Sequence, residues 1–61
     1  MKVQYEKDGN IIEVDAWREG FKAAANEQST ETNPYTFRST AYHEWRKGWF
    51  ECAWYLADKG D

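Results

Sequence analysis

The chain has 61 residues, a net charge of −3 and an aromatic content of 18%, with four tryptophans and four tyrosines. A domain this short buries only about 60% of its unfolded surface, so we expect the aromatic rings to supply most of the core. A lone cysteine excludes an intramolecular disulfide, and no apolar stretch approaches the roughly 18 residues that a membrane span needs. These features predict a single domain, residues 1–61, with a cytoplasmic location and no membrane contact.

Residues 2–14 predict a β-hairpin that turns at Asp8-Gly9, a dipeptide typical of two-residue type I′ turns. In that register the apolar side chains share one face and pair across the strands, Val3 with Val14 and Tyr5 with Ile12. An isolated hairpin is only marginally stable in water, so its apolar face needs a helix to cover it.

Residues 15–28 are predicted to form a first helix, with Asp15 as its N-cap and three consecutive alanines that favour helix. The polar stretch 29–39 contains the turn signal Asn33-Pro34 and is predicted to be a connector. A second helix is expected over residues 40–58.

Both predicted helices carry the same short pattern, Trp17-Arg18-Glu19-Gly20-Phe21 and Trp45-Arg46-Lys47-Gly48-Trp49. The two aromatic residues and the glycine of each copy share one helix face, and the glycine allows another backbone to approach closely. We therefore expect the helices to pack as an antiparallel two-helix hairpin that crosses at the glycines. The expected fold class is α+β, mostly α, with the N-terminal β-hairpin preceding this helical pair.

The second helix carries a further apolar stripe, formed by His43, Phe50 and Trp54, that points about 120° away from the face expected to meet the first helix. Two interpretations are open. The hairpin could lay its apolar face on the stripe, or the stripe could be exposed and bind a partner protein or a second copy of the chain. We favour cover by the hairpin.

Five basic residues could form a modest patch if the helix faces and the end of the connector converge: Arg18, Lys22, Arg38, Arg46 and Lys47. Ordinary solvated charge is the favoured alternative. Tyr35 and Phe37 flank Thr36 next to Pro34 and could stack on nucleic-acid bases or cap the open end of the helical pair, and the structural role is favoured. The acidic net charge argues against a large nucleic-acid footprint and leaves room only for a local RNA contact.

The sequence lacks the usual signs of catalysis. His43 has no second histidine or cysteine at zinc-ligand spacing, and Cys52 is expected to be a small core residue on another side of the helix. A glycine-rich phosphate loop is absent, and 61 residues leave little room for a substrate cleft. We expect a protein that is not an enzyme and has no catalytic residue, metal ion or cofactor.

Three motifs in sequence order carry a resemblance to a known family: Gly20-Phe21-Lys22-Ala23, Asn33-Pro34-Tyr35, and Trp45-Arg46-Lys47-Gly48-Trp49 with Glu51. Over residues 16–58 the chain resembles the ribosome modulation factor family and related small phage and plasmid proteins of the CrpP type. The resemblance implies a two-helix protein that binds the small ribosomal subunit near the messenger exit, contacts the end of its RNA and helps to convert ribosomes into inactive dimers.

The chain also departs from that family. It is acidic where the ribosome binders are strongly basic, Phe50 stands where they tend to carry a basic residue, and the hairpin at residues 2–14 looks like an addition. The leading hypothesis is a non-catalytic binding protein that acts on the ribosome or the translation machinery. The alternative is a phage- or plasmid-encoded effector that binds a protein through its aromatic and acidic surface. Antibiotic modification, claimed for the CrpP type, finds no nucleotide-binding element in the sequence.

Overall fold

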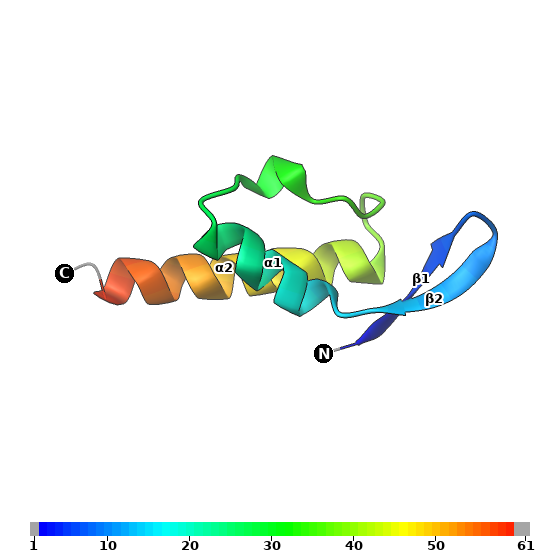
Figure 1. Cartoon of the computed structure of the whole chain (residues 1–61), viewed down its shortest axis with the longest axis horizontal. Coiled ribbons are helices and arrows are strands. Elements are labelled where there is room, and N and C mark those ends of the chain that lie inside the picture. The colour runs from blue at the N-terminus through cyan, green and yellow to red at the C-terminus, as the bar shows by residue number, and fades with distance from the viewer. Residues whose placement is uncertain (1, 60–61) are drawn as a thin grey trace.

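The computed structural model describes residues 2–59. Strands β1 (Val3–Lys7) and β2 (Asn10–Val14) form an antiparallel hairpin, and helices α1 (Ala16–Ala25) and α2 (Thr40–Lys59) follow it (Figure 1). A short 3-10 turn, η1 (Thr30–Thr32), lies in the connector between the helices. The expected class, α+β and mostly α with an N-terminal hairpin followed by two helices, is confirmed.

The hairpin has the register that its turn sequence predicts. Val3 pairs with Val14 and Tyr5 pairs with Ile12. Asp8 and Gly9 have φ angles of 53° and 80°, which are the left-handed values that a type I′ turn requires at both central positions.

Helix α1 begins as predicted but ends earlier than residue 28. The Asp15 side chain caps its start, because Oδ1 accepts a hydrogen bond from the Arg18 amide at 3.2 Å. At the other end Glu27 adopts a φ of 61°, and the Gln28 amide donates to the carbonyl of Ala23. This is a Schellman-type cap with a glutamate where glycine is usual, so no glycine in the sequence marked the end of the helix.

The two helices run in the same direction, and the prediction of an antiparallel pair is wrong. Their starts lie together, because Ala16 and Ala41 are both fully buried in the cluster beside the hairpin. Further along, the Trp49 indole donates a hydrogen bond of 2.7 Å to the carbonyl of Gln28, just past the end of α1. Residues 26–39 therefore cross back over α1 before α2 begins (Figure 1). Ten helical residues span only about 15 Å, so a connector of this length allows either direction.

The glycine crossing predicted from the repeated motif is confirmed. Gly20 lies against the backbone carbonyl of Trp45, and Gly48 lies against the backbone carbonyl of Trp17, so a Cβ at either glycine would overlap with that carbonyl. Because the two contacts are reciprocal, an approximate two-fold axis between the helices relates the two copies of the motif. The helix pair therefore has two equivalent faces.

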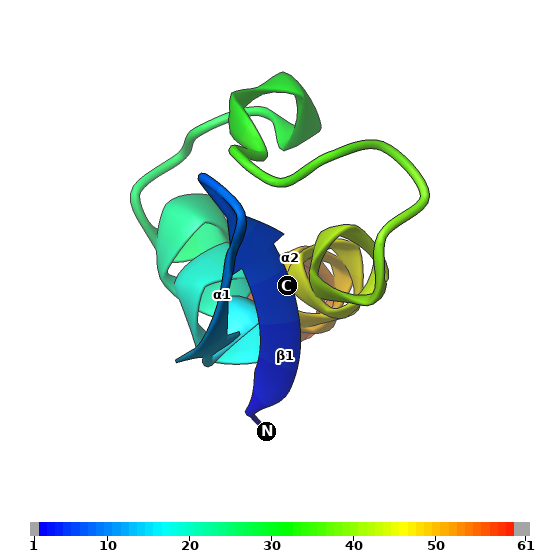
Figure 2. The ribbon, with the colours of Figure 1, turned by 90° about the vertical axis from the view of Figure 1, so that its right-hand side faces the viewer.

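One of these faces, called here the covered face, is packed under the connector and the hairpin (Figures 1 and 2). Its central side chain, Trp45, is only 2% exposed. Partly buried side chains pack around this core: Val3, Tyr5, Val14, Tyr35 and Trp49. The hydrophobic core of the protein thus lies on one side of the helix pair.

Hydrogen bonds of Asn33 hold the connector on the covered face. The Asn33 side-chain nitrogen Nδ2 donates a hydrogen bond of 3.2 Å to the backbone carbonyl of Tyr42 in α2. The side-chain oxygen Oδ1 of Asn33 accepts a hydrogen bond of 3.1 Å from the backbone amide of Tyr35. The Asn-Pro-Tyr motif therefore ties the end of the connector to the first turns of α2.

Candidate binding site

The stripe of His43, Phe50 and Trp54 is exposed, and the prediction that the hairpin covers it is wrong. Phe50 is 49% exposed and Trp54 is 73% exposed. Only Asp15 separates the end of β2 at Val14 from the start of α1, so the hairpin is held at the helix starts, where its apolar side chains meet the core cluster.

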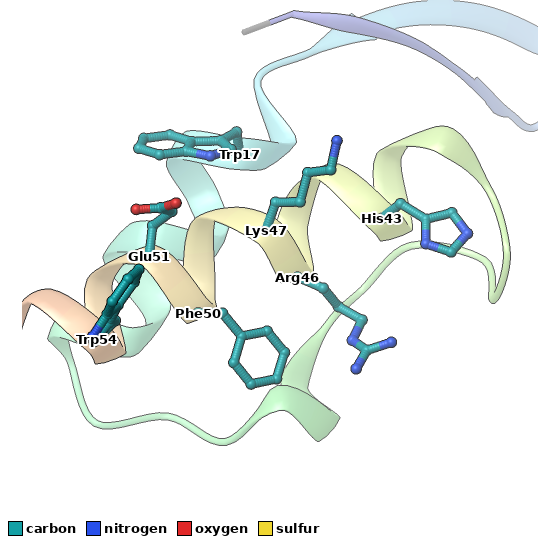
Figure 3. A pocket seen from close by; sticks show the side chains of 7 residues that line it. All are labelled: Trp17, His43, Arg46, Lys47, Phe50, Glu51 and Trp54. Carbon is teal, nitrogen blue, oxygen red and sulfur yellow. The ribbon is translucent and has the colours of Figure 1, made fainter.

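The exposed stripe forms one wall of an open groove of about 540 Å³. The lining residues are Trp17 from α1 and, from α2, His43, Arg46, Lys47, Phe50, Glu51 and Trp54 (Figure 3). Lys47 and Glu51 extend toward Trp17, whereas Arg46 and Phe50 extend toward the opposite side of α2. The groove thus combines three aromatic rings, two permanent cations, a histidine and one carboxylate.

The groove has a counterpart on the covered face. A depression there is lined by Trp45 of α2, by three residues of α1 and by connector residues: Glu19, Lys22, Ala23, Asn26, Gln28, Thr32 and Pro34. When the two copies of the motif are aligned, Trp45 corresponds to Trp17. In the same alignment the positions on the covered face correspond to groove residues, namely Glu19, Lys22, Ala23 and Asn26 to Lys47, Phe50, Glu51 and Trp54. The chain has one connector, which covers Trp45 and leaves the equivalent face at Trp17 open. The repeat signalled that either Trp17 or Trp45 would lie on an uncovered face, because one connector can cover only one of two equivalent faces, but it did not indicate which.

A line of alternating rings and guanidinium groups extends the groove toward the connector. The Arg46 guanidinium carbon lies 5.5 Å from the Phe50 ring centroid and 5.9 Å from that of Tyr42. Tyr42 in turn meets the 67% exposed ring of Phe37 edge-on at 5.2 Å, and Arg38 lies 5.5 Å from that ring. These distances suit cation–π attraction and hold the cations beside exposed rings. Tyr42 was not predicted from the sequence to belong to a binding site.

The five basic residues proposed as a patch are divided between two faces. Arg46 and Lys47 line the groove, and the ring contacts link Arg38 to it. Lys22 lines the depression on the covered face, and Arg18 is exposed on α1 without lining the groove. The local basic surface is therefore smaller than proposed.

Tyr35 has a structural position and does not line the groove. Its hydroxyl donates a hydrogen bond of 2.6 Å to Glu19 Oε2, and its ring meets that of Tyr5 edge-on at 4.8 Å. Burial and the hydrogen bond to Glu19 raise the pKa of the Tyr35 phenol above its ordinary value. Tyr35 therefore joins the connector, α1 and the hairpin, and its assignment as a binding residue is not supported by its position.

Glu44 differs from the other acidic residues of α2 because it is buried rather than solvated. It is 8% exposed, and its Oε1 lies 3.5 Å from the Lys47 ammonium. The other carboxylate oxygen has no hydrogen-bond partner within the described residues. Lys47 thus compensates a buried charge while its ammonium lies at the groove edge, so changes at Lys47 require a check of stability.

Cys52 is only 2% exposed, whereas His43 lies on the exposed face of α2, so these two side chains do not form a nucleophile and base pair. Within residues 2–59, no three His, Cys, Asp or Glu side chains gather where they could hold a metal ion. In the same range, neither helix is both long and apolar enough to cross a bilayer.

Comparison of the chain with models of protein families, with curated proteins and with solved structures found no match. The resemblance to the ribosome modulation factor family therefore stays a hypothesis, carried by the three motifs alone.

Proposed function

We propose that the protein is a non-catalytic binding protein that acts on the ribosome or another part of the translation machinery. Its binding surface would be the open groove between Trp17 of α1 and the exposed stripe of α2. The observation that carries the proposal is the meeting of Arg46 and Lys47 with the exposed rings of Phe50 and Trp54 in one groove. Single-stranded RNA is bound by this combination, since cations pair with phosphates while rings stack on bases.

The groove also reconciles the proposal with the acidic composition. A net charge of −3 opposes a wide RNA interface. Around the groove, however, the cations Arg38, Arg46 and Lys47 stand against two carboxylates, Glu51 and the buried Glu44 that pairs with Lys47, so a small positive surface remains. A contact of a few nucleotides needs only such a patch. The motif resemblance supplies the small ribosomal subunit as the target to test first.

The test is co-sedimentation with small ribosomal subunits at increasing salt. Arg46→Ala with Lys47→Ala should weaken binding at least about tenfold and lower the slope of log affinity against log salt by about one per lost phosphate contact. Arg18→Ala with Lys22→Ala is the matched control, because it removes one arginine and one lysine outside the groove and should change binding little. Equal effects of the two pairs, or no binding by the parent, would refute the proposal. Melting curves of each variant confirm that it is folded.

A second candidate is a phage- or plasmid-encoded effector that inhibits or adapts a partner protein. It is favoured by the last turns of α2, which extend beyond α1 (Figure 1) and expose Trp54, Tyr55 and Leu56 at 73%, 54% and 47%. Glu51 and Asp58 line a depression with two of these rings, which gives an apolar surface with an acidic border. Capture of one soluble partner that survives high salt and is lost in Trp54→Ser would favour this candidate over the ribosome.

A further inference from the structure

We propose that the exposed stripe of α2 is also a self-association surface on which two copies of the chain pair their α2 helices in antiparallel orientation. The stripe has the spacing of a coiled-coil seam. His43, Lys47, Phe50, Trp54 and Ala57 follow one another at alternating intervals of four and three residues. All five are outside the buried core, on the side of α2 away from the buried Cys52 and from Gly48, which meets α1.

Antiparallel pairing gives this seam a complementary set of layers. A two-fold axis placed midway between Phe50 and Trp54 sets Phe50 of each copy against Trp54 of the other copy. The same axis sets Lys47 against Ala57, so a long side chain meets a small one. Phe50 and Trp54 are 49% and 73% exposed, and their rings are large apolar anchors of the kind that dominate interfaces.

The charge distribution along α2 selects the antiparallel orientation. The N-terminal end of the stripe carries His43, Arg46 and Lys47, and its C-terminal end carries Asp58. Antiparallel copies bring Lys47 of each chain beside Asp58 of the other, which forms two symmetric ion pairs. Parallel copies would instead place the cationic ends together. Glu51 lies near the two-fold axis and would face Glu51 of the other copy. Repulsion between the two carboxylates would lower the affinity of the dimer.

The rest of the fold leaves room for the second copy. The connector lies over the covered face, and the hairpin lies at the N-terminal end of α2 (Figures 1 and 2). The paired segment, residues 46–58, is about 18 Å long and includes the C-terminal turns that α1 does not reach. An interface of this length, with two ring anchors per chain, falls at the small end of specific interfaces and predicts a reversible dimer.

Self-association does not depend on the proposed function, but it would affect target binding. Self-association and target binding would use the same rings and the same lysine, so the two states exclude each other. Free protein would be held as a dimer at high concentration, and a ribosome or protein target would draw it into the monomeric form.

The experiment is sedimentation equilibrium of the purified whole chain, with no target present, from about 10 µM to about 1 mM, the range in which small interfaces associate. The expected result is a monomer–dimer equilibrium. Asp58→Lys should weaken dimerisation about tenfold, and Lys47→Glu combined with Asp58→Lys should recover most of the loss by reversing both ion pairs. Glu51→Gln should strengthen it. Glu31→Lys changes charge in η1, away from the stripe, and serves as the control.

Lys47 also compensates the buried Glu44, so the reversed pair is informative only if its melting curve shows a folded protein. Trp54→Ser provides a second variant, because this exposed ring can be removed without loss of core packing and its loss should abolish the dimer. A parent chain that stays monomeric throughout, or a dimer indifferent to both Asp58→Lys and Trp54→Ser, would overturn the proposal. A chain that dimerises but does not bind ribosomes would support the self-association proposal and refute only the proposed function.

Discussion

The covered and open faces of the helix pair are built from the same repeated motif, yet they have different roles. On the covered face the connector buries Trp45 to 2% exposure, and the positions around it are small or polar: Glu19, Lys22, Ala23 and Asn26. On the open face the corresponding positions of α2 include Phe50 and Trp54, which remain exposed to solvent. Large rings are therefore present on the face that no part of residues 2–59 covers. This difference separates residues that stabilise the fold from residues available for binding.

Replacing the central tryptophan of each face is the strongest test of whether the two faces contribute differently to stability. Trp45→Ala should lower the free energy of unfolding by about 3–5 kcal/mol, which is most of the roughly 3–9 kcal/mol expected for a domain of this size. Trp17→Ala should cost about 1–2 kcal/mol, because Trp17 is half-buried and stacks on Phe21 at 5.3 Å. Urea unfolding of both variants measures the difference. Equal losses would show that the two faces are equally part of the core.

Gly48→Ala tests the crossing on which both faces depend. A methyl group at this position meets the backbone carbonyl of Trp17, so the helices must move apart, at a cost of about 1–3 kcal/mol. Gly9→Ala is a useful contrast, because Gly9 has open space around it but a φ of 80°, and its cost should come from backbone strain in the turn alone. Thermal melts that leave Gly48→Ala within a degree or two of the parent would contradict the close crossing.

A smaller effect tests how the covered face is closed at Tyr35. The raised pKa of its phenol means that the folded state favours the neutral, hydrogen-bonded form. This contribution to stability is complete below the ordinary tyrosine pKa of about 10 and is lost as pH rises above that value. The parent should therefore lose stability more steeply above pH 10 than Tyr35→Phe, as measured by urea unfolding across alkaline pH. Parallel curves for the two proteins would show that burial and the hydrogen bond to Glu19 do not raise the pKa of Tyr35.

Local structure was predictable from the sequence because local signals determine it. The Asp8-Gly9 turn and strand alternation gave the hairpin register, and the glycines of the repeated motif gave the crossing. The direction of the helices was not predictable in the same way, since a connector of this length can reach either end of α2. The end of α1 was missed because Glu27 adopts a left-handed conformation in which glycine is usual.

The candidate site was found only in part. Arg46, Lys47, Phe50 and Trp54 were named from the sequence, but the rings and the cations were treated as separate surfaces. Which face the hairpin covers is decided by the one-residue junction at Asp15, and no side-chain pattern reports that geometry. Trp17 was missed as a groove residue because it was assigned to the helix seam with Trp45.

The central claim is that the exposed rings of the open face bind a partner and add little to stability, and the variant that combines Phe50→Ser with Trp54→Ser tests it most directly. Urea unfolding and sedimentation equilibrium should be measured on the same preparation. The account predicts a free energy of unfolding within about 1 kcal/mol of the parent, together with loss of the dimer and of target binding. Unfolding of the variant, as expected if two buried rings were truncated at about 3–5 kcal/mol each, would contradict it.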